Sequence, residues 1–351
     1  MRSIHFLVSG LPWPDPFDPQ ALSELRLPAL ERLLARGAEL SPPPPHLEGW
    51  LEALWGYAAG SAPFAALVAR GAGLEPAGAI WMCADPIHLR AEGSDLRAHS
   101  GPSLRLDAAD AAALVAALND FLAEDGIALH GLSAERWVAT IPRMPDLHTV
   151  PTSVLQGRAV GPVMLRGGHA AEWMRRLTEA QMLMHEHPVN AARERAGLPP
   201  VNSLWFWGPG PWAPPPAQPF DAVFSDNPLL RALASGVGID TRSAPRDAGP
   251  AIGAATRGRV LVDYPEIGFA ARMMDVEAWR TALTGFDEGY VGPALVALGA
   301  GMIDRILLTA TDGPRGLAVR LGRAGLLRVW RRSVPLSKRF PPLSAPGLHR
   351  R

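Results

Sequence analysis

The chain has 351 residues, of which 48% are hydrophobic and 19% are charged. This balance is ordinary for a globular protein and excludes a disordered or fibrous chain. Its 34 Lys and Arg residues are matched by 34 Asp and Glu residues, so no net field attracts nucleic acid or an anionic membrane. Lys338 is the only lysine and Cys83 the only cysteine. A single cysteine excludes an internal disulfide and a zinc site built on cysteines.

The N-terminal part alternates between strand-like and helical patterns. Residues 3–9 form an apolar run that predicts a buried strand, and residues 12–19 form a loop rich in Pro and Asp. Two helical segments follow, at 21–37 and at 47–59, and the first becomes regular from Pro28. This order predicts an α/β sheet with helices on both faces.

A second pattern begins near residue 79. Strands are predicted at 79–84, 104–106 and 137–141, and Asp107 is the expected N-cap of a helix that runs to about residue 124. The order strand, strand, helix, strand is typical of a small α+β unit with its own sheet. Helices are then expected at 170–185 and 188–197, and residues 202–208 form a strand-like aromatic run.

From residue 220 the α/β pattern returns. The expected strands are 222–224, 260–263 and 305–310, and the expected helices are 228–235 and 276–300. Residues 331–351 hold six basic and no acidic residues, which predicts a disordered basic tail. No apolar run approaches the ~20 residues of a membrane-spanning helix, so we expect a cytoplasmic protein without a membrane span.

Four stretches of the sequence together resemble one family. The most specific is His187-Pro188-Val189-Asn190 with Arg193, followed by the aromatic run 202–210. The others are LPALERLLARG at 27–37, the segment 85–119, and 286–288 with the later ILLTATDG that contains Asp312. They are similar to the archaeal-type cofactor-independent phosphoglycerate mutases of the alkaline-phosphatase superfamily. The chain looks closest to a bacterial branch described as pathogenicity-factor regulatory proteins.

The resemblance implies an α/β fold in which an alkaline-phosphatase-like core sheet is flanked by helices and interrupted by a small inserted α+β domain. We assign residues 1–78 and 169–330 to the core and residues 79–168 to the insertion. The resemblance also implies a site with two divalent cations and a serine nucleophile, where the cations clamp the attacking and leaving oxygens.

The residues that this chemistry needs are missing from the expected positions. Ser9 stands where the family has an aspartate, and Leu47 falls near the nucleophile position. None of the ten histidines lies between residues 188 and 348, the half from which the family draws its histidine ligands. Asp263 and Asp312 are weak remnants of the metal ligands. We therefore predict no catalytic residue, no bound metal and no cofactor.

Eight residues are candidate ligand-binding groups: Asp85, His88, Arg90, Arg136, His187, Asn190, Arg193 and Asn202. Asp85 would orient His88, while Arg90 would bind phosphate or carboxylate through its planar fork. The alternative is a strand-end turn with a surface ion pair. The resemblance places Arg136 near a family arginine beside the substrate, although lone arginines are usually surface residues.

The last four candidates surround one turn. His187 is the expected N-cap of the helix that begins at Pro188, where an anion can also sit. Asn190, Arg193 and Asn202 either contact a ligand there or form a hydrogen-bonded brace between domains. The aromatic residues 205–207 are expected in the core rather than on a base-stacking surface.

Two functional hypotheses remain open. The first is a non-catalytic phosphoglycerate-mutase-like protein, regulatory or binding a small anionic ligand between its lobes, with an unidentified protein partner and no nucleic acid. The second is a divergent metal-dependent phosphomutase or phosphatase that acts on a phosphorylated small acid. The loss of several independent catalytic groups favours the first.

Overall fold

The computed structural model describes residues 1–11, 13, 18, 20–93, 95–155, 159–161, 165–311 and 316–340. The chain divides into two compact units, one built from Met1–Trp55 and Ala217–Arg351 and the other from Gly56–Pro216. The second unit is wider than the segment 79–168 assigned from the sequence. The reason is strand pairing, because the aromatic run after residue 202 joins the sheet of the second unit.

The first unit is built on a seven-stranded sheet with the order β2-β12-β11-β1-β10-β8-β9. Its strands are β1 (Ser3–Ser9), β2 (Ala38–Glu39), β8 (Ala222–Phe224), β9 (Asp240–Arg242), β10 (Arg259–Tyr264), β11 (Arg305–Thr311) and β12 (Leu317–Gly322). The strands β11, β1, β10, β8 and β9 are parallel, so their carboxyl ends meet at one edge. The strand β12 runs antiparallel to both of its neighbours.

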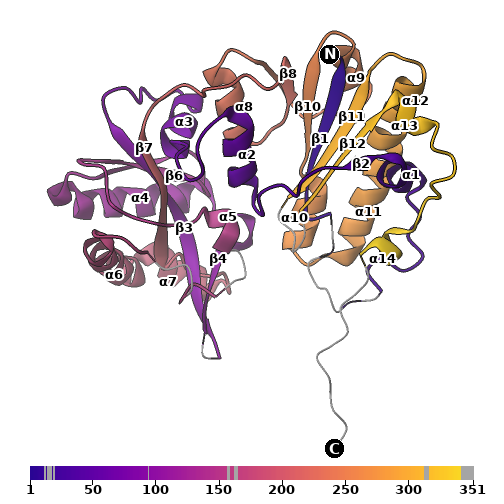
Figure 1. Ribbon diagram of the computed structural model, residues 1–351. Coiled ribbons are helices and arrows are strands. Elements are labelled where there is room, and N and C mark those ends of the chain that lie inside the picture. The colour runs from indigo at the N-terminus through magenta and orange to yellow at the C-terminus, as the bar shows by residue number, and fades with distance from the viewer. Residues whose placement is uncertain are drawn as a thin grey trace, which may run out of the picture. The chain divides into compact units, whose positions relative to one another are not determined.

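Helices cover both faces of this sheet (Figure 1). The face that carries Ile4, Phe6 and Val8 packs against α1 (Pro28–Arg36), α9 (Gly249–Ala255), α10 (Glu266–Arg272), α11 (Val276–Phe286) and α12 (Gly292–Gly299). On the opposite face lie α2 (Leu47–Trp55) and α8 (Pro228–Gly236), with His5 of β1 in edge contact with Trp50 at 5.5 Å between ring centroids. The expected α/β core sheet with flanking helices is therefore confirmed.

The end of the first unit differs from the sequence expectation. The expected helix 276–300 is interrupted by a π-helical turn at Asp287–Val291, where the Asp287 carboxylate accepts from the Leu30 amide and so caps α1. After α13 (Arg323–Leu326) the chain forms α14 (Leu336–Arg339), and Leu336 is buried in the core. In the first part of the predicted disordered tail, Leu336 is thus buried and Phe340 packs against the core, while residues 341–351 and Asp312 lie outside the described residues.

The second unit has a five-stranded antiparallel sheet. Its strands are β3 (Ile80–Glu92), β4 (Asp95–Ser100), β5 (Ala128–Gly131), β6 (Trp137–Ile141) and β7 (Ser203–Pro211). One face packs on α4 (Ala108–Leu122) and α6 (Ala170–Glu186), followed by α7 (Pro188–Arg195). The other face meets α3 (Phe64–Gly71), through contact between Phe64 and Trp207, and α5 (Thr152–Leu155).

Two expectations for this unit are wrong and one is confirmed. The strand expected at 79–84 continues to Glu92, because its second half pairs with β4. The strand expected at 104–106 is absent, since Gly101–Leu104 is a 3₁₀ turn. Asp107 is the N-cap of α4, as predicted, and accepts from the Asp110 amide at 2.8 Å. Within the described ranges, no helix is long and apolar enough to cross a membrane.

Candidate functional site

The strand β3 changes partner in its middle. It pairs with β6 up to Cys83 and with β4 from Ile87 onward, while β7 follows it on the other side. Pro86 lies in this interval, where its missing N–H costs no ladder hydrogen bond toward β6 or β4. The fork between β6 and β4 therefore leaves room for side chains of Asp85 and of the residue that precedes β6, Arg136.

Asp85 occupies the fork and is 1% exposed. Its Oδ2 atom accepts hydrogen bonds from Arg136 Nη1 at 2.6 Å, Thr152 Oγ1 at 2.5 Å and Trp207 Nε1 at 2.8 Å. Burial raises the pKa of Asp85 above its ordinary value, while the Arg136 charge and the hydrogen bonds from Thr152 and Trp207 lower it. An unpaired carboxylate would be very costly at this depth, so the Arg136 pair is what makes the buried charge tolerable.

Arg136 is the part of this cluster that reaches the surface. Its guanidinium lies over the Trp207 ring, 5.2 Å from the centroid, and its side chain is 32% exposed. The ion pair and the aromatic ring hold the planar group in one orientation, which reduces the entropy lost when a ligand binds. Of the eight candidates, Arg136 best combines a fixed charge with access to solvent.

The predicted pairing of Asp85 with His88 is wrong. The two residues are three apart in one strand, and residues at an odd separation point to opposite faces of a sheet. His88 Nδ1 instead contacts the Pro200 carbonyl at 2.9 Å, and its ring lies 6.1 Å from His99. Burial lowers the pKa of His88. Arg90 is mostly exposed and lies 4.0 Å from Glu92, which matches the surface ion pair that was the alternative.

Arg193 is a structural brace inside the second unit. Its side chain is 2% exposed and donates to the carbonyls of Leu104 at 2.5 Å and Pro199 at 3.0 Å, and to Asp110 Oδ2 at 3.2 Å. These partners come from three segments, so the guanidinium ties α7 to the start of α4. Little of the group remains for a ligand.

The other residues of this turn have similar roles. His187 is the N-cap of α7, as predicted, because its Nδ1 accepts from the Val189 amide at 3.2 Å. The side-chain amide nitrogen of Asn190, Nδ2, donates to the carbonyls of Met184 and Val201, both at 2.7 Å. Asn202 bonds both backbone groups of Leu89. These contacts join segments of the second unit to one another, so they form a brace within the unit, while the expected brace between domains and the ligand role stay predictions.

Two partners of Asp85 were missed from the sequence. Trp207 is buried as expected for the aromatic run, but its Nε1 atom also completes the Asp85 cluster. Thr152 comes from α5, which the sequence pattern did not predict. The sequence carried only a general chemical signal, that a buried indole N–H needs an acceptor. Asp85 and Trp207 come together because β3 pairs with β7.

The carboxyl edge of the first sheet is where open α/β sheets usually bind ligands. Ser9 ends β1 there, beside Thr311 at the end of β11. The Ser9 hydroxyl lies against Gly268 of α10, so close that a Cβ atom on Gly268 would lie 1.8 Å from its Oγ. Thr311 is buried, and its Oγ1 has no hydrogen-bond partner among the described residues.

Asp263 is the remnant carboxylate that the structure describes at this edge. Its Oδ2 accepts from Ser225 Oγ at 2.7 Å. Burial raises the pKa of Asp263 to about 6, and the nearby charges of Glu266 and Asp226 also act to raise it. The carboxylates are thus near one another, but in the described ranges no three His, Cys, Asp or Glu side chains are arranged to hold a metal ion.

The two described histidines of the first unit, His5 and His46, do not supply the missing ligands. His5 is buried in β1 with Nε2 at 2.8 Å from Thr309 Oγ1, and burial lowers its pKa to about 4. His46 accepts from the Gly49 amide through Nδ1 at 3.0 Å, at the start of α2. The described residues of this edge therefore do not fit the two-metal site that the resemblance implies.

Comparison with known proteins gives two kinds of match. No family model matches the chain. Over 198 residues, 50% of the chain, it is 31% identical to the 2,3-bisphosphoglycerate-independent phosphoglycerate mutase of Methanothrix thermoacetophila and covers 49% of that protein. The chain therefore spans about half the length of the curated relative that it matches.

Among solved structures, the PH0037 protein from Pyrococcus horikoshii matches with a TM-score of 0.54 and 15% identity, over 92% of this chain and 87% of that one. The cofactor-independent phosphoglycerate mutase from Thermoplasma acidophilum matches with a TM-score of 0.46 and 21% identity, over 92% and 90%. The first match shows a shared fold. Together with the sequence match, it agrees with the phosphoglycerate-mutase-like fold expected from the motifs.

Proposed function

We propose that this chain is a non-catalytic relative of the cofactor-independent phosphoglycerate mutases and belongs to their regulatory bacterial branch. It would act in the cytoplasm by binding a small anion. A protein partner would then bind the anion-bound and the anion-free chain differently. The observation that carries the proposal is the carboxyl edge of the first sheet, where Ser9 packs on Gly268 and Asp263 is bonded to Ser225. A serine cannot replace a carboxylate that bridges two cations.

The test of the non-catalytic part is direct. The purified chain should not interconvert phosphoglycerates in the presence of Mn²⁺, Mg²⁺, Co²⁺ or Zn²⁺. Conversion that a chelator abolishes would refute the proposal.

The ligand part centres on Arg136. Phosphate or 3-phosphoglycerate should raise the melting temperature of the unmutated protein, and Arg136→Gln should reduce this shift. Arg136→Gln also leaves Asp85 buried without its ion pair, which destabilises the unit. The double variant Asp85→Asn, Arg136→Gln removes both charges and is the matched control: it should regain stability, but its ligand response should stay reduced. A ligand response of undiminished size in the double variant would contradict the role of Arg136.

One observation favours the second candidate function, a metal-dependent phosphomutase or phosphatase. Asp263 lies near Glu266 and Asp226, and burial together with these charges raises its pKa and so disfavours its ionised form. A divalent cation would relieve that cost. Saturable Mn²⁺ binding that Asp263→Asn abolishes, together with chelator-sensitive phosphatase activity, would favour this candidate over the first.

A further inference from the structure

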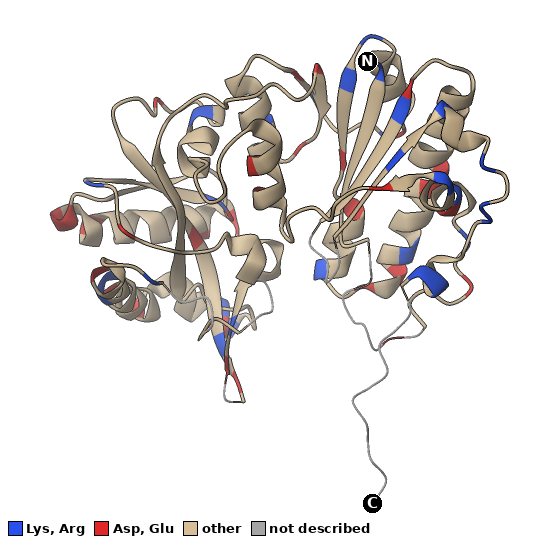
Figure 2. Ribbon diagram, viewed as in Figure 1, with Lys and Arg blue, Asp and Glu red and all other residues tan. Residues whose placement is uncertain are grey.

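A groove in the first unit lies between the end of α1 and the segment that follows α13. Its volume is about 630 Å³, within the range of small-molecule sites. Four arginines line it, Arg328, Arg331, Arg332 and Arg339, together with Glu31 and Glu39. Figure 2 shows blue stretches of ribbon, which mark Lys and Arg positions, along the segment after α13 and on α14. The sequence has no acidic residue after Asp312, so this part of the chain is strongly cationic.

Backbone carbonyl groups orient two of these arginines, Arg328 and Arg331. Arg328 Nη1 and Arg331 Nη1 donate to the carbonyls of Arg36 and Gly37, at 3.5 and 3.3 Å. These carbonyls end α1, where the helix dipole attracts cations. Each bond uses one N–H of a guanidinium that has five. The interaction therefore orients the two side chains and leaves most of their donors for another acceptor.

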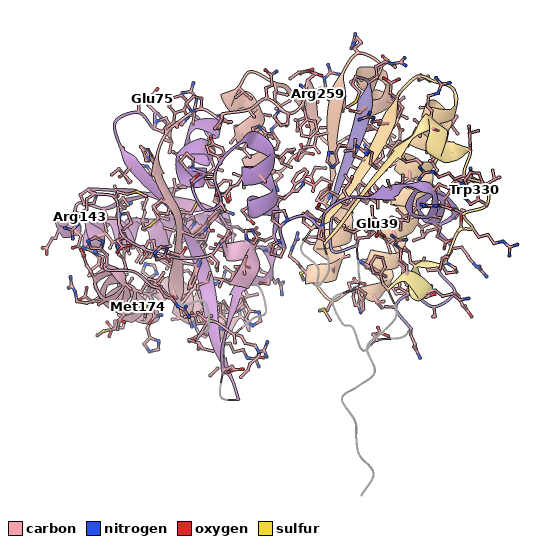
Figure 3. All side chains as sticks on the ribbon, in the orientation of Figure 1. Glu39, Glu75, Arg143, Met174, Arg259 and Trp330 are labelled. Atoms are coloured by element: carbon pink, nitrogen blue, oxygen red, sulfur yellow. The ribbon has the colours of Figure 1, made fainter. Side chains whose placement is uncertain are left out.

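Few carboxylates neutralise the groove. Arg339 pairs with Glu39 of β2, which Figure 3 labels, but no described acidic side chain lies within ion-pair distance of Arg328, Arg331 or Arg332. The labelled Trp330 projects from the same segment and is 74% exposed. Three guanidinium groups thus face one concave surface without an anionic partner among the described residues.

Glu31 adds a second, independent observation. Its residue is 9% exposed, it lines the groove, and its Oε1 atom has no hydrogen-bond partner among the described residues. A buried acceptor without a donor is costly. A ligand with an anionic group and a hydroxyl group could bind both kinds of side chain. Its anionic group would accept hydrogen bonds from the arginines, and its hydroxyl group would donate one to Glu31.

We propose that this groove binds a small phosphate ester that carries hydroxyl groups. The phosphate oxygens accept from Arg331 and Arg332, whose planar forks suit a phosphate dianion. A hydroxyl group of the ligand donates to Glu31 Oε1. This site is in the other compact unit from Arg136, so it is separate from the ligand site proposed above.

The test is a binding titration of the full chain by calorimetry with two probes. Glycerol 3-phosphate carries two hydroxyl groups, and propyl phosphate carries none. We expect glycerol 3-phosphate to bind more tightly, and Glu31→Ala to reduce its affinity to that of propyl phosphate. The double variant Arg331→Ala, Arg332→Ala should weaken both probes by about tenfold or more, the usual effect of losing charge-assisted hydrogen bonds.

Controls separate this site from general electrostatic attraction. Arg257 is exposed, belongs to the same unit and lies outside the groove, so Arg257→Ala should leave binding unchanged. If the double variant does not fold, the single change Arg332→Gln at an exposed position replaces it. The proposal is overturned if neither ester binds saturably, if Arg257→Ala weakens binding as much as the groove variants, or if the two esters bind equally well.

Discussion

Charged residues of the same type differ in burial in this protein, and their contacts differ accordingly. Arg193 and Arg332 carry the same group, yet the first is enclosed by carbonyls within its unit and the second is exposed at a groove. Asp85 and Asp263 are both buried, but only Asp85 has an arginine partner within hydrogen-bond distance. The consequences can be measured one residue at a time.

Arg193→Ala should destabilise the second unit. The change removes hydrogen bonds to three segments and leaves buried carbonyls without a donor, at a cost on the order of 3 kcal/mol. Thermal unfolding should show a melting temperature lower by several degrees. Arg195→Ala is the matched control on the same helix, because Arg195 is exposed and bonds only its own turn through the Ala191 carbonyl. Equal effects of the two changes would contradict the brace.

Asp263 should make stability depend on pH in a definite direction. Its pKa is about 6 in the folded chain and 3.8 in the reference state, so folding favours the protonated form. The native state therefore loses stability as pH rises from about 4 to about 6. Asp263→Asn should be more stable than the unmutated chain above pH 6, by on the order of 1–3 kcal/mol. Denaturant unfolding at pH 4 and pH 7.5 checks this, because the gain should vanish at pH 4.

At the scale of elements, strand pairing and close contacts explain the length of β3 and the position of α10, which the local sequence pattern does not explain. The strand β3 is long because three other strands pair with different parts of it. The helix α10 lies close to the end of β1 because Gly268 has no side chain at the contact with Ser9. A glycine in a helix normally lowers the stability of the folded state relative to alanine. At Gly268 this loss accompanies the close contact between α10 and Ser9.

Two glycine-to-alanine changes test whether Gly268 is needed for the close contact between α10 and β1. Gly268→Ala would place a Cβ atom 1.8 Å from Ser9 Oγ, and the overlap should cost about 1–3 kcal/mol. Gly253→Ala in α9 is the matched control, because no atom lies within 4 Å of its Cβ position, and it should add up to ~1 kcal/mol. Chemical denaturation measures both. Stabilisation by Gly268→Ala would show that α10 does not approach the strand so closely.

At the scale of the whole molecule, the catalytic chemistry of the resembled family needs ligands from distant parts of the chain. The first unit is assembled from residues before 56 and after 216, and its second part contains no histidine before His349. We therefore expect that restoring one ligand does not restore a two-metal site.

Ser9→Asp tests this dependence. The change returns a carboxylate to the end of β1, where the resembled family has one. We expect the variant to show no chelator-sensitive phosphoglycerate conversion with Mn²⁺, because the histidine ligands are still missing. Circular dichroism should confirm that the variant is folded, since the Ser9 side chain is tightly packed. Activity in Ser9→Asp but not in the unmutated chain would mean that the remaining carboxylates suffice.

The sequence alone determined the elements whose signals are local. The strand at 3–9, the caps Asp107 and His187, and the strands at 222–224, 260–263 and 305–310 all appear where they were expected, because hydrophobic periodicity and capping act over one or two turns. The count of histidines likewise needed no structure. Only the tertiary structure decided which residues meet. Asp85 pairs with Arg136 rather than His88 because a strand exposes alternate residues to opposite faces and because β6 and β4 diverge at that point. The arginine groove was not predicted either, because α1 and the segment after α13 are distant in sequence and are brought together only by the packing of the first unit.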